Sequence, residues 1–268
     1  MADPFQDVDA AGPEFIKSFA DSMDVRQSDP TMEAIVAAYL GMVSIPDNGR
    51  VIEIGAGAGA VTRRIARHAD PAEVIGYEPS QGFVNEARLR AGDARNLRFE
   101  MANGTDLPEA DAAADAVVFH TVLSHVVDPA ALIAEAVRVL KPGGQLVICD
   151  ADFSKATLSS FPNDPLDMCA REFVRNFVTD AHIVGKLSGF LQDAGLDVTR
   201  FGLTSRVVTT PQQMLPWVEM TARQMEERGD IGQDLADALI AEHNRRAAVG
   251  TLYGYQAFAT VIGQKGQN

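Results

Sequence analysis

The chain has few of the residues that hold small or metal-dependent proteins together: two cysteines and one tryptophan among 268 residues. Cys149 and Cys169 make no disulfide framework, and neither stands in a cysteine–histidine pattern with the spacing of a zinc site. A chain of this length buries roughly 70–75% of its unfolded surface, so it needs neither disulfides nor metals to remain folded. We therefore expect no metal site.

Basic residues are outnumbered, since 23 lysines and arginines stand against 37 aspartates and glutamates, a formal net charge of −14 at pH 7. Such a surface repels phosphate backbones and anionic lipids. No uncharged apolar run is as long as the stretch of about 18 residues that is needed to span a bilayer. Residues 1–9 are acidic and lack the pattern of a secretory signal. We expect a cytoplasmic protein, monomer or homodimer, whose partner is a small molecule rather than a nucleic acid or a membrane.

Helical and strand patterns alternate along the chain. Short apolar runs bounded by glycine and proline predict strands, and apolar residues four apart predict amphipathic helices. The predicted strands are residues 50–54, 73–77, 97–101, 116–119, 145–149, 196–208 and 255–262. The predicted helices are residues 31–43, 61–69, 79–88, 128–140, 166–178, 182–194, 212–228 and 231–248. This alternation predicts an α/β protein with a parallel sheet and helices on both faces, and the later strands complete the same sheet.

The sharpest motif follows the first predicted strand and reads Glu53-Ile-Gly-Ala-Gly-Ala-Gly59. A strand that runs through three alternate glycines into a helix brings backbone N–H groups close to a ligand. Gly55, Gly57 and Ala60 also satisfy the dinucleotide fingerprint, with the acidic Glu78 about 20 residues further on. Glu53 favours a different ligand, because a carboxylate at this strand end repels a pyrophosphate and attracts an ammonium or a sulfonium.

Five motifs in this order resemble the class I S-adenosylmethionine-dependent methyltransferases, of the kind related to ubiquinone and small-molecule methyltransferases. They are the glycine motif, Gly76-Tyr-Glu-Pro79, Asn103-Gly-Thr-Asp-Leu-Pro108, a strand and loop that end in Ser124-His125, and Val139-Leu-Lys-Pro-Gly-Gly144. The resemblance is clear over residues 48–150 and weak at the last strand. It implies a Rossmann-like, seven-stranded, mostly parallel sheet in a three-layer sandwich, with a helical lid insertion.

The resemblance also implies S-adenosylmethionine as cofactor. The glycine loop holds its methionine part, and Glu78 accepts from both ribose hydroxyls. Asn103 replaces the family's usual aspartate, which accepts a hydrogen bond from the adenine amino group. An amide oxygen can still accept this hydrogen bond, although without a negative charge. A helix carrying Phe15, Phe19 and Met23 closes over the cofactor in relatives, although a plain packing role is equally open. The expected cofactor residues are Phe19, Glu53, Gly55, Ala56, Gly57, Gly59, Glu78, Pro79, Asn103, Gly104, Thr105, His120 and Thr121.

His125 and Asp150 are the candidate catalytic bases, because both are predicted just beyond strand carboxyl ends, where open α/β sheets bind ligands. Each has a plainer alternative: His125 can bond a loop carbonyl, and Asp150 can cap the segment that follows it.

The expected organisation is an N-terminal helical cap over residues 1–45 and a methyltransferase domain over residues 46–268. That domain comprises a cofactor-binding half (46–150) and a substrate-side half (151–268) with a helical insertion at 211–250. The expected activity is methyl transfer to an oxygen or nitrogen of a small organic molecule. Two alternatives stay open: a non-methylating S-adenosylmethionine-binding protein of the same fold, and an NAD-dependent oxidoreductase. The second is less favoured because the Glu53 carboxylate would repel the pyrophosphate of NAD.

Overall fold

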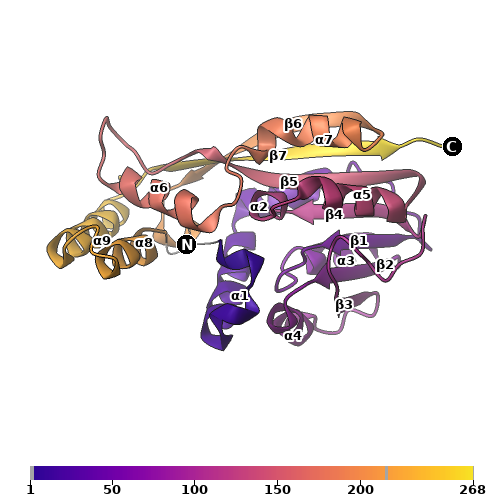
Figure 1. Cartoon of the computed structure of the whole chain (residues 1–268), viewed down its shortest axis with the longest axis horizontal. Helices are drawn as coiled ribbons and strands as arrows, with labels where there is room; N and C mark the ends of the chain where they lie inside the picture. Colours follow the sequence, from indigo (N-terminus) through magenta and orange to yellow (C-terminus); the bar gives the residue numbers. More distant parts are fainter. Residues whose placement is uncertain (1–2, 215–216, 268) are drawn as a thin grey trace.

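The computed structural model describes residues 3–214 and 217–267, and it contains the expected seven-stranded sheet (Figure 1). The strands are β1 (Arg50–Ile54), β2 (Glu73–Glu78), β3 (Leu97–Met101), β4 (Ala114–His120), β5 (Leu140–Thr157), β6 (Leu196–Val208) and β7 (Gly254–Lys265). Their order in the sheet is β3-β2-β1-β4-β5-β7-β6. The neighbouring strands β3, β2, β1, β4 and β5 run parallel to one another, and β7 pairs antiparallel with both β5 and β6. The predicted mostly parallel sheet is confirmed.

Helices cover both faces of this sheet. They are α1 (Pro13–Gln27), α2 (Pro30–Leu40), α3 (Thr62–Ala69), α4 (Gln81–Arg90), α5 (Pro129–Val139), α6 (Leu166–Phe177), α7 (Leu187–Asp193), α8 (Trp217–Glu227) and α9 (Gln233–Ala248). Alternate strand residues point to opposite faces. Val51 therefore packs in one core with side chains of α2 and α3, and Ile52 packs in the other with side chains of α5 and α7.

Local chemistry fixes where several helices begin. The Asp29 carboxylate accepts from the backbone N–H of Thr31 at 2.9 Å and caps α2. The Asp128 carboxylate accepts from the N–H of Ala131 at 3.1 Å and caps α5, with Pro129 at the first helical position. Side chains of this kind satisfy backbone donors that have no partner inside the helix. This requirement explains why α2 and α5 begin directly after Asp29 and Asp128.

The fifth strand is much longer than the predicted 145–149. β4 pairs with β5 as far as His120 and Cys149, but β7 continues beside β5 up to the pair of Thr157 with Tyr255. The expectation that Asp150 lies just beyond a strand end is therefore wrong, because the antiparallel partner prolongs the ladder through it. Figure 1 shows the three long strands β5, β6 and β7 running past the parallel sheet toward α6, α8 and α9.

Among residues 3–214 and 217–267, no helix combines the length and apolar character needed to cross a membrane.

Candidate cofactor and acceptor site

The glycine loop after β1 has a conformation that requires glycine. Gly55, Gly57 and Gly59 have positive φ angles of 75°, 53° and 75°, a region that residues with a side chain rarely adopt. A Cβ on Gly55 would lie 2.6 Å from a methyl group of Val122, and one on Gly59 would lie 2.4 Å from the ring of Phe99. The two outer glycines thus permit close packing beneath and beside the loop.

Glu78, at the end of β2, ties this loop to the neighbouring strand. Its Oε2 accepts from the N–H of Gly57 at 2.9 Å, and its Oε1 accepts from the N–H of Ser80 at 3.1 Å. Burial raises the pKa of Glu78 to about 7, and the two backbone bonds only partly oppose this effect. Each carboxylate oxygen keeps a second lone pair, so Glu78 can still accept two hydrogen bonds from a ligand.

Beside Glu78 lies a cavity of about 210 Å³ at the carboxyl ends of the parallel strands. Seven of the expected cofactor residues line it: Gly55, Gly57, Glu78, Pro79, Asn103, Gly104 and Thr121. Six do not: Phe19, Glu53, Ala56, Gly59, Thr105 and His120. The edge of the sheet thus brings together residues that lie far apart in the sequence, as open α/β folds do at their ligand sites.

Glu53 lies beneath the loop rather than in the cavity wall. Its side chain is only 1% exposed, and its Oε2 has no hydrogen-bond partner among the described residues. Burial raises the pKa of Glu53 to about 8, and the nearby Glu78 adds to the effect. A buried carboxylate of this kind is costly to ionise, and a cation bound close by relieves that cost.

Asn103 lines the cavity, but its amide oxygen is already occupied. Its Oδ1 accepts from both the N–H (3.1 Å) and the hydroxyl (3.0 Å) of Thr105. These two bonds use both lone pairs of the oxygen, which leaves the Nδ2 donors for a ligand. The expected acceptance from an adenine amino group therefore does not fit this side-chain arrangement, whereas donation to a ring nitrogen does.

Two expected cofactor residues face elsewhere. The Nδ1 of His120 lies 3.2 Å from the hydroxyl of Tyr39 on α2, and burial lowers the pKa of His120 to about 3. Phe19 lines a second, smaller cavity of about 50 Å³ next to the first. Phe5, Arg26 and His125 line both cavities, so these three side chains form the partition between them.

His125 is held by a carboxylate that sequence reasoning missed. Its Nδ1 lies 2.9 Å from Oδ2 of Asp3, and the hydroxyl of Thr179 also donates to that oxygen at 3.1 Å. A carboxylate can only accept, so Nδ1 carries the hydrogen and the neutral ring keeps a lone pair on Nε2. Nothing in the sequence around Asp3 signals this pairing, which joins two segments 122 residues apart.

Asp150 lies within β5 and lines neither cavity. Its Oδ2 accepts from the N–H of Ser124 at 3.2 Å, and its Oδ1 accepts from the N–H of Ala151 at 2.8 Å. Burial raises its pKa. The bond to Ser124 holds the short turn that carries His125, so Asp150 is placed to position that histidine rather than to touch a ligand.

The N-terminal segment, residues 3–12, covers the junction of the two cavities. At one end the Asp9 carboxylate accepts from two backbone amides at the start of α4, at 2.9 and 3.0 Å. At the other end Asp3 holds His125. Phe5 and Val8, between these anchors, line the larger cavity.

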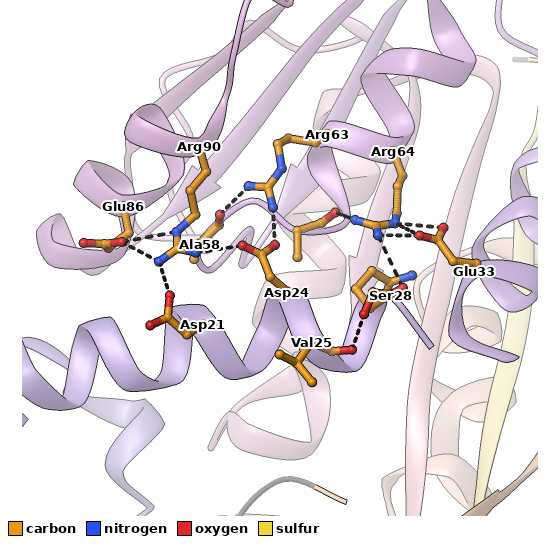
Figure 2. Close-up of polar contacts among 12 residues, drawn as sticks. Asp21, Asp24, Val25, Ser28, Glu33, Ala58, Arg63, Arg64, Glu86 and Arg90 are labelled. Carbon is orange, nitrogen blue, oxygen red and sulfur yellow. Dashed lines mark hydrogen bonds and ion pairs between the residues drawn. The ribbon is translucent and has the colours of Figure 1, made fainter. Parts of the chain in front are cut away.

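Ion pairs fasten α1 onto the helices next to the glycine loop (Figure 2). Asp24 pairs with Arg63 of α3 and, at 2.8 Å, with Arg90 of α4. Asp21, one turn earlier, also pairs with Arg90 at 2.8 Å. Arg63 further donates to the carbonyl of Ala58 in the loop, at 3.0 Å. The helix that carries Met23 and Arg26 over the cavity is thereby linked to the loop itself.

Arg26 is the other residue that sequence reasoning missed. Its Nη2 donates to the hydroxyl of Thr121 at 3.1 Å, and its Nε is buried with no partner among the described residues. The signal was present, because Arg26 follows Phe19 and Met23 by seven and three residues and so shares their face of α1. Within the described ranges, no group of three or more histidine, cysteine, aspartate or glutamate side chains is arranged to hold a metal ion.

The fold places a glycine loop and a strand-end carboxylate in a cavity at the edge where open α/β sheets bind ligands. A family model described as "Methyltransferase domain" matches residues 52–148. The demethylmenaquinone methyltransferase of Tropheryma whipplei (strain Twist) is 30% identical over 171 residues, which cover 59% of this chain and 70% of that protein. The chain therefore belongs to the class I S-adenosylmethionine-dependent methyltransferase family, whose cofactor is S-adenosylmethionine. This membership sets the nicotinamide alternative aside.

Other relatives carry less information about activity. An uncharacterized 37.1 kDa protein in transposon TN4556 of Streptomyces fradiae is 29% identical over 210 residues, which cover 70% of this chain and 60% of that protein. The chain thus spans between 60% and 70% of the length of these two relatives. The solved structure of the [4+2]-cyclase SpnF is 21% identical with a TM-score of 0.57, covering 88% of this chain and 82% of that one. That likeness is one of fold alone.

Proposed function

We propose that this protein transfers the methyl group of S-adenosylmethionine to an oxygen or nitrogen of a small organic molecule. The observation that carries the proposal is the pair of adjoining cavities, which share His125. The larger one has the glycine loop and Glu78 in its wall and suits the cofactor. The smaller one lies across His125 from it and suits an acceptor.

The residues around the larger cavity fit the cofactor chemically. Glu78 retains acceptor capacity for the two ribose hydroxyls, and Asn103 retains donors for a ring nitrogen of adenine. Gly55 and Gly57 let the methionine part approach the backbone closely. The buried Glu53 carboxylate complements the positive charge of the ammonium and sulfonium groups, and the Arg26 guanidinium complements the carboxylate.

When bound, the cofactor supplies a methyl carbon that forms a bond to the acceptor's lone pair while its bond to sulfur breaks and that electron pair goes to sulfur. The protein aligns the acceptor, which can contribute about 7–11 kcal/mol by orientation alone. For a hydroxyl acceptor, Nε2 of His125 takes the departing proton, and Asp3 orients the ring and stabilises its charged form. Such a base contributes about 10²–10⁴-fold in rate.

We also propose that residues 1–45 form a cap over the cofactor and that residues 211–250 form a lid over the acceptor. Met23 and Arg26 of α1 line the larger cavity, and Trp217 of α8 lines the smaller one. Residues 46–150 then form the cofactor-binding half, and residues 151–268 the substrate-side half. Leu215 and Pro216 lie outside the described residues.

The test is to incubate the protein with S-adenosylmethionine carrying a deuterated methyl group and a panel of small phenols, amines and carboxylic acids. Product S-adenosylhomocysteine is quantified, and the position of the label in the methylated product is located by NMR. Methyl transfer to oxygen or nitrogen supports the proposal, and a label on carbon contradicts the proposed acceptor atom. Tight cofactor binding with no S-adenosylhomocysteine formed from any acceptor favours a non-methylating protein of this fold.

A further inference from the structure

Aromatic rings line one side of the smaller cavity, and residues of the long strands β5, β6 and β7 line the other. Phe173 of α6 stacks on Trp217 of α8, with ring centroids 4.3 Å apart and planes 14° apart. Phe153 of β5 lies 6.3 Å from both of these rings. In the floor, Arg206 of β6 is the register partner of Gln256 of β7, and both side chains line the cavity. Flat walls of this kind accommodate a planar ring.

The buried guanidinium of Arg206 has fewer hydrogen-bond acceptors around it than it has N–H donors. Its side chain is 2% exposed, and its Nε and Nη2 have no hydrogen-bond partner among the described residues. The nearest carboxylate is that of Asp29, whose Oδ2 lies 3.6 Å from Nη2. That carboxylate already accepts from Gln213 and from the N–H of Thr31, each at 2.9 Å. A buried guanidinium left in this state carries a large desolvation cost.

The other unpartnered groups around this cavity are also donors. Nε of Arg26 and Nε1 of Trp217 are buried without a partner in the described part of the chain. Burial, together with the neighbouring Arg206 guanidinium, lowers the pKa of Arg26 to about 10. A buried guanidinium and an indole N–H thus line this cavity, and Nε of Arg26 lies at its boundary with the larger one, in a protein whose net charge is −14. An anion with several lone pairs is the group that satisfies such a set.

We propose that the smaller cavity binds the carboxylate of an aromatic acceptor, with Arg206 as its principal partner and the ring against Phe153 and Trp217. The volume of about 50 Å³ leaves space for the carboxylate group itself, and entry of the ring requires a change of the Phe5 rotamer in the partition. The acceptor atom then lies toward His125 and the cofactor. This inference rests on the proposed function, since it assigns the acceptor's chemical class.

The test uses the full chain saturated with S-adenosylhomocysteine and matched pairs of aromatic ligands that differ only in charge. The pairs are benzoate and benzamide, 4-hydroxybenzoate and 4-hydroxybenzamide, and indole-3-carboxylate and its carboxamide. Ligand-observed NMR and calorimetry measure binding. We expect the carboxylates to bind roughly 10- to 100-fold more tightly than their amides, as for hydrogen bonds to charged groups. Equal binding within the pairs, or no binding by any carboxylate, overturns the inference.

Arg206→Gln removes the cation, and Arg200→Gln, at an exposed position of the same strand, is the matched control. We expect the preference for carboxylates to disappear in Arg206→Gln and to persist in Arg200→Gln, while both variants bind S-adenosylhomocysteine like the wild type. A preference retained by a folded Arg206→Gln variant overturns the inference. If that variant does not fold, the matched pairs on the wild type decide alone.

The two proposals fail in different ways. Methyl transfer to neutral and anionic aromatics at equal efficiency overturns this inference and leaves the proposed function standing. Selective binding of carboxylates with no transfer to any acceptor overturns the proposed function and leaves the anion site standing.

Discussion

Replacing Glu53 with glutamine is expected to make the free protein more stable and cofactor binding weaker. Burial holds the pKa of Glu53 near 8, against 4.5 for an ordinary glutamate. Between these values the folded state binds more protons than the unfolded state, so this residue lowers the free energy of unfolding as pH rises through that window. Glutamine resembles the protonated form and avoids the cost of ionisation.

The size of the effect follows from the same shift. A pKa shift of one unit corresponds to about 1.36 kcal/mol. A pKa raised from 4.5 to about 8 therefore predicts that Glu53→Gln increases the free energy of unfolding by about 3–5 kcal/mol above pH 8 and by almost nothing at pH 4. The opposite effect is expected on binding, because the variant loses a buried negative charge beneath the glycine loop, which favours a positively charged ligand in the cavity. We expect affinity for S-adenosylmethionine to fall about tenfold through the loss of this electrostatic interaction.

Urea unfolding of the cofactor-free protein at pH 5, 7 and 9 measures the first effect, and calorimetry at pH 8 measures the second. Glu227→Gln, an exposed position at the end of α8, is the control and should change neither. A Glu53→Gln variant that is less stable than the wild type at pH 9 would show that the carboxylate has a structural partner. A variant with unchanged affinity would remove Glu53 from the cofactor site.

Three further predictions follow from the site. Because the pKa of Glu78 is about 7, its ionised form grows about tenfold between pH 6 and pH 8; calorimetric affinity for S-adenosylhomocysteine should rise similarly, and Glu78→Gln should abolish this slope. His125→Ala should lower turnover more than about tenfold with unchanged cofactor affinity, and unchanged turnover in a kinetic assay would remove it from the mechanism. Gly59→Ala should destabilise the protein by about 1–3 kcal/mol in thermal unfolding, since its Cβ would lie 2.4 Å from Phe99; a wild-type melting temperature would contradict the packing argument.

Much of the fold could be predicted because local signals agree with the final architecture. Short apolar runs bounded by glycine and proline located all seven strands, and the helix predicted at residues 128–140 corresponds to α5. The extension of β5 beyond Cys149 was not predicted, because it depends on pairing with β7, which lies about 100 residues further along the chain. A window of local sequence cannot reveal such a ladder.

Some residues of the candidate site could likewise be predicted from the sequence, and others could not. Residues at strand ends, such as Gly57 and Glu78, were predictable because the topology of an open sheet brings strand carboxyl ends together. Asp3 and Arg206 were not, because they reach the cavities from the N-terminal segment and the far end of β6. Arg26 was missed although its spacing from Phe19 and Met23 places it on their face of α1. The placement of these residues depends on tertiary contacts such as the pairing of Asp24 with Arg63 and Arg90 in Figure 2.

The central claim is that the cavity beside Glu78 holds S-adenosylmethionine, and calorimetric titration of the wild-type protein tests it most directly. We expect one molecule of S-adenosylmethionine or S-adenosylhomocysteine bound per chain, binding lost or strongly weakened in Glu78→Gln, and no heat with NAD. Absence of heat with both sulfur compounds, or saturable binding of NAD that Glu78→Gln abolishes, would contradict it.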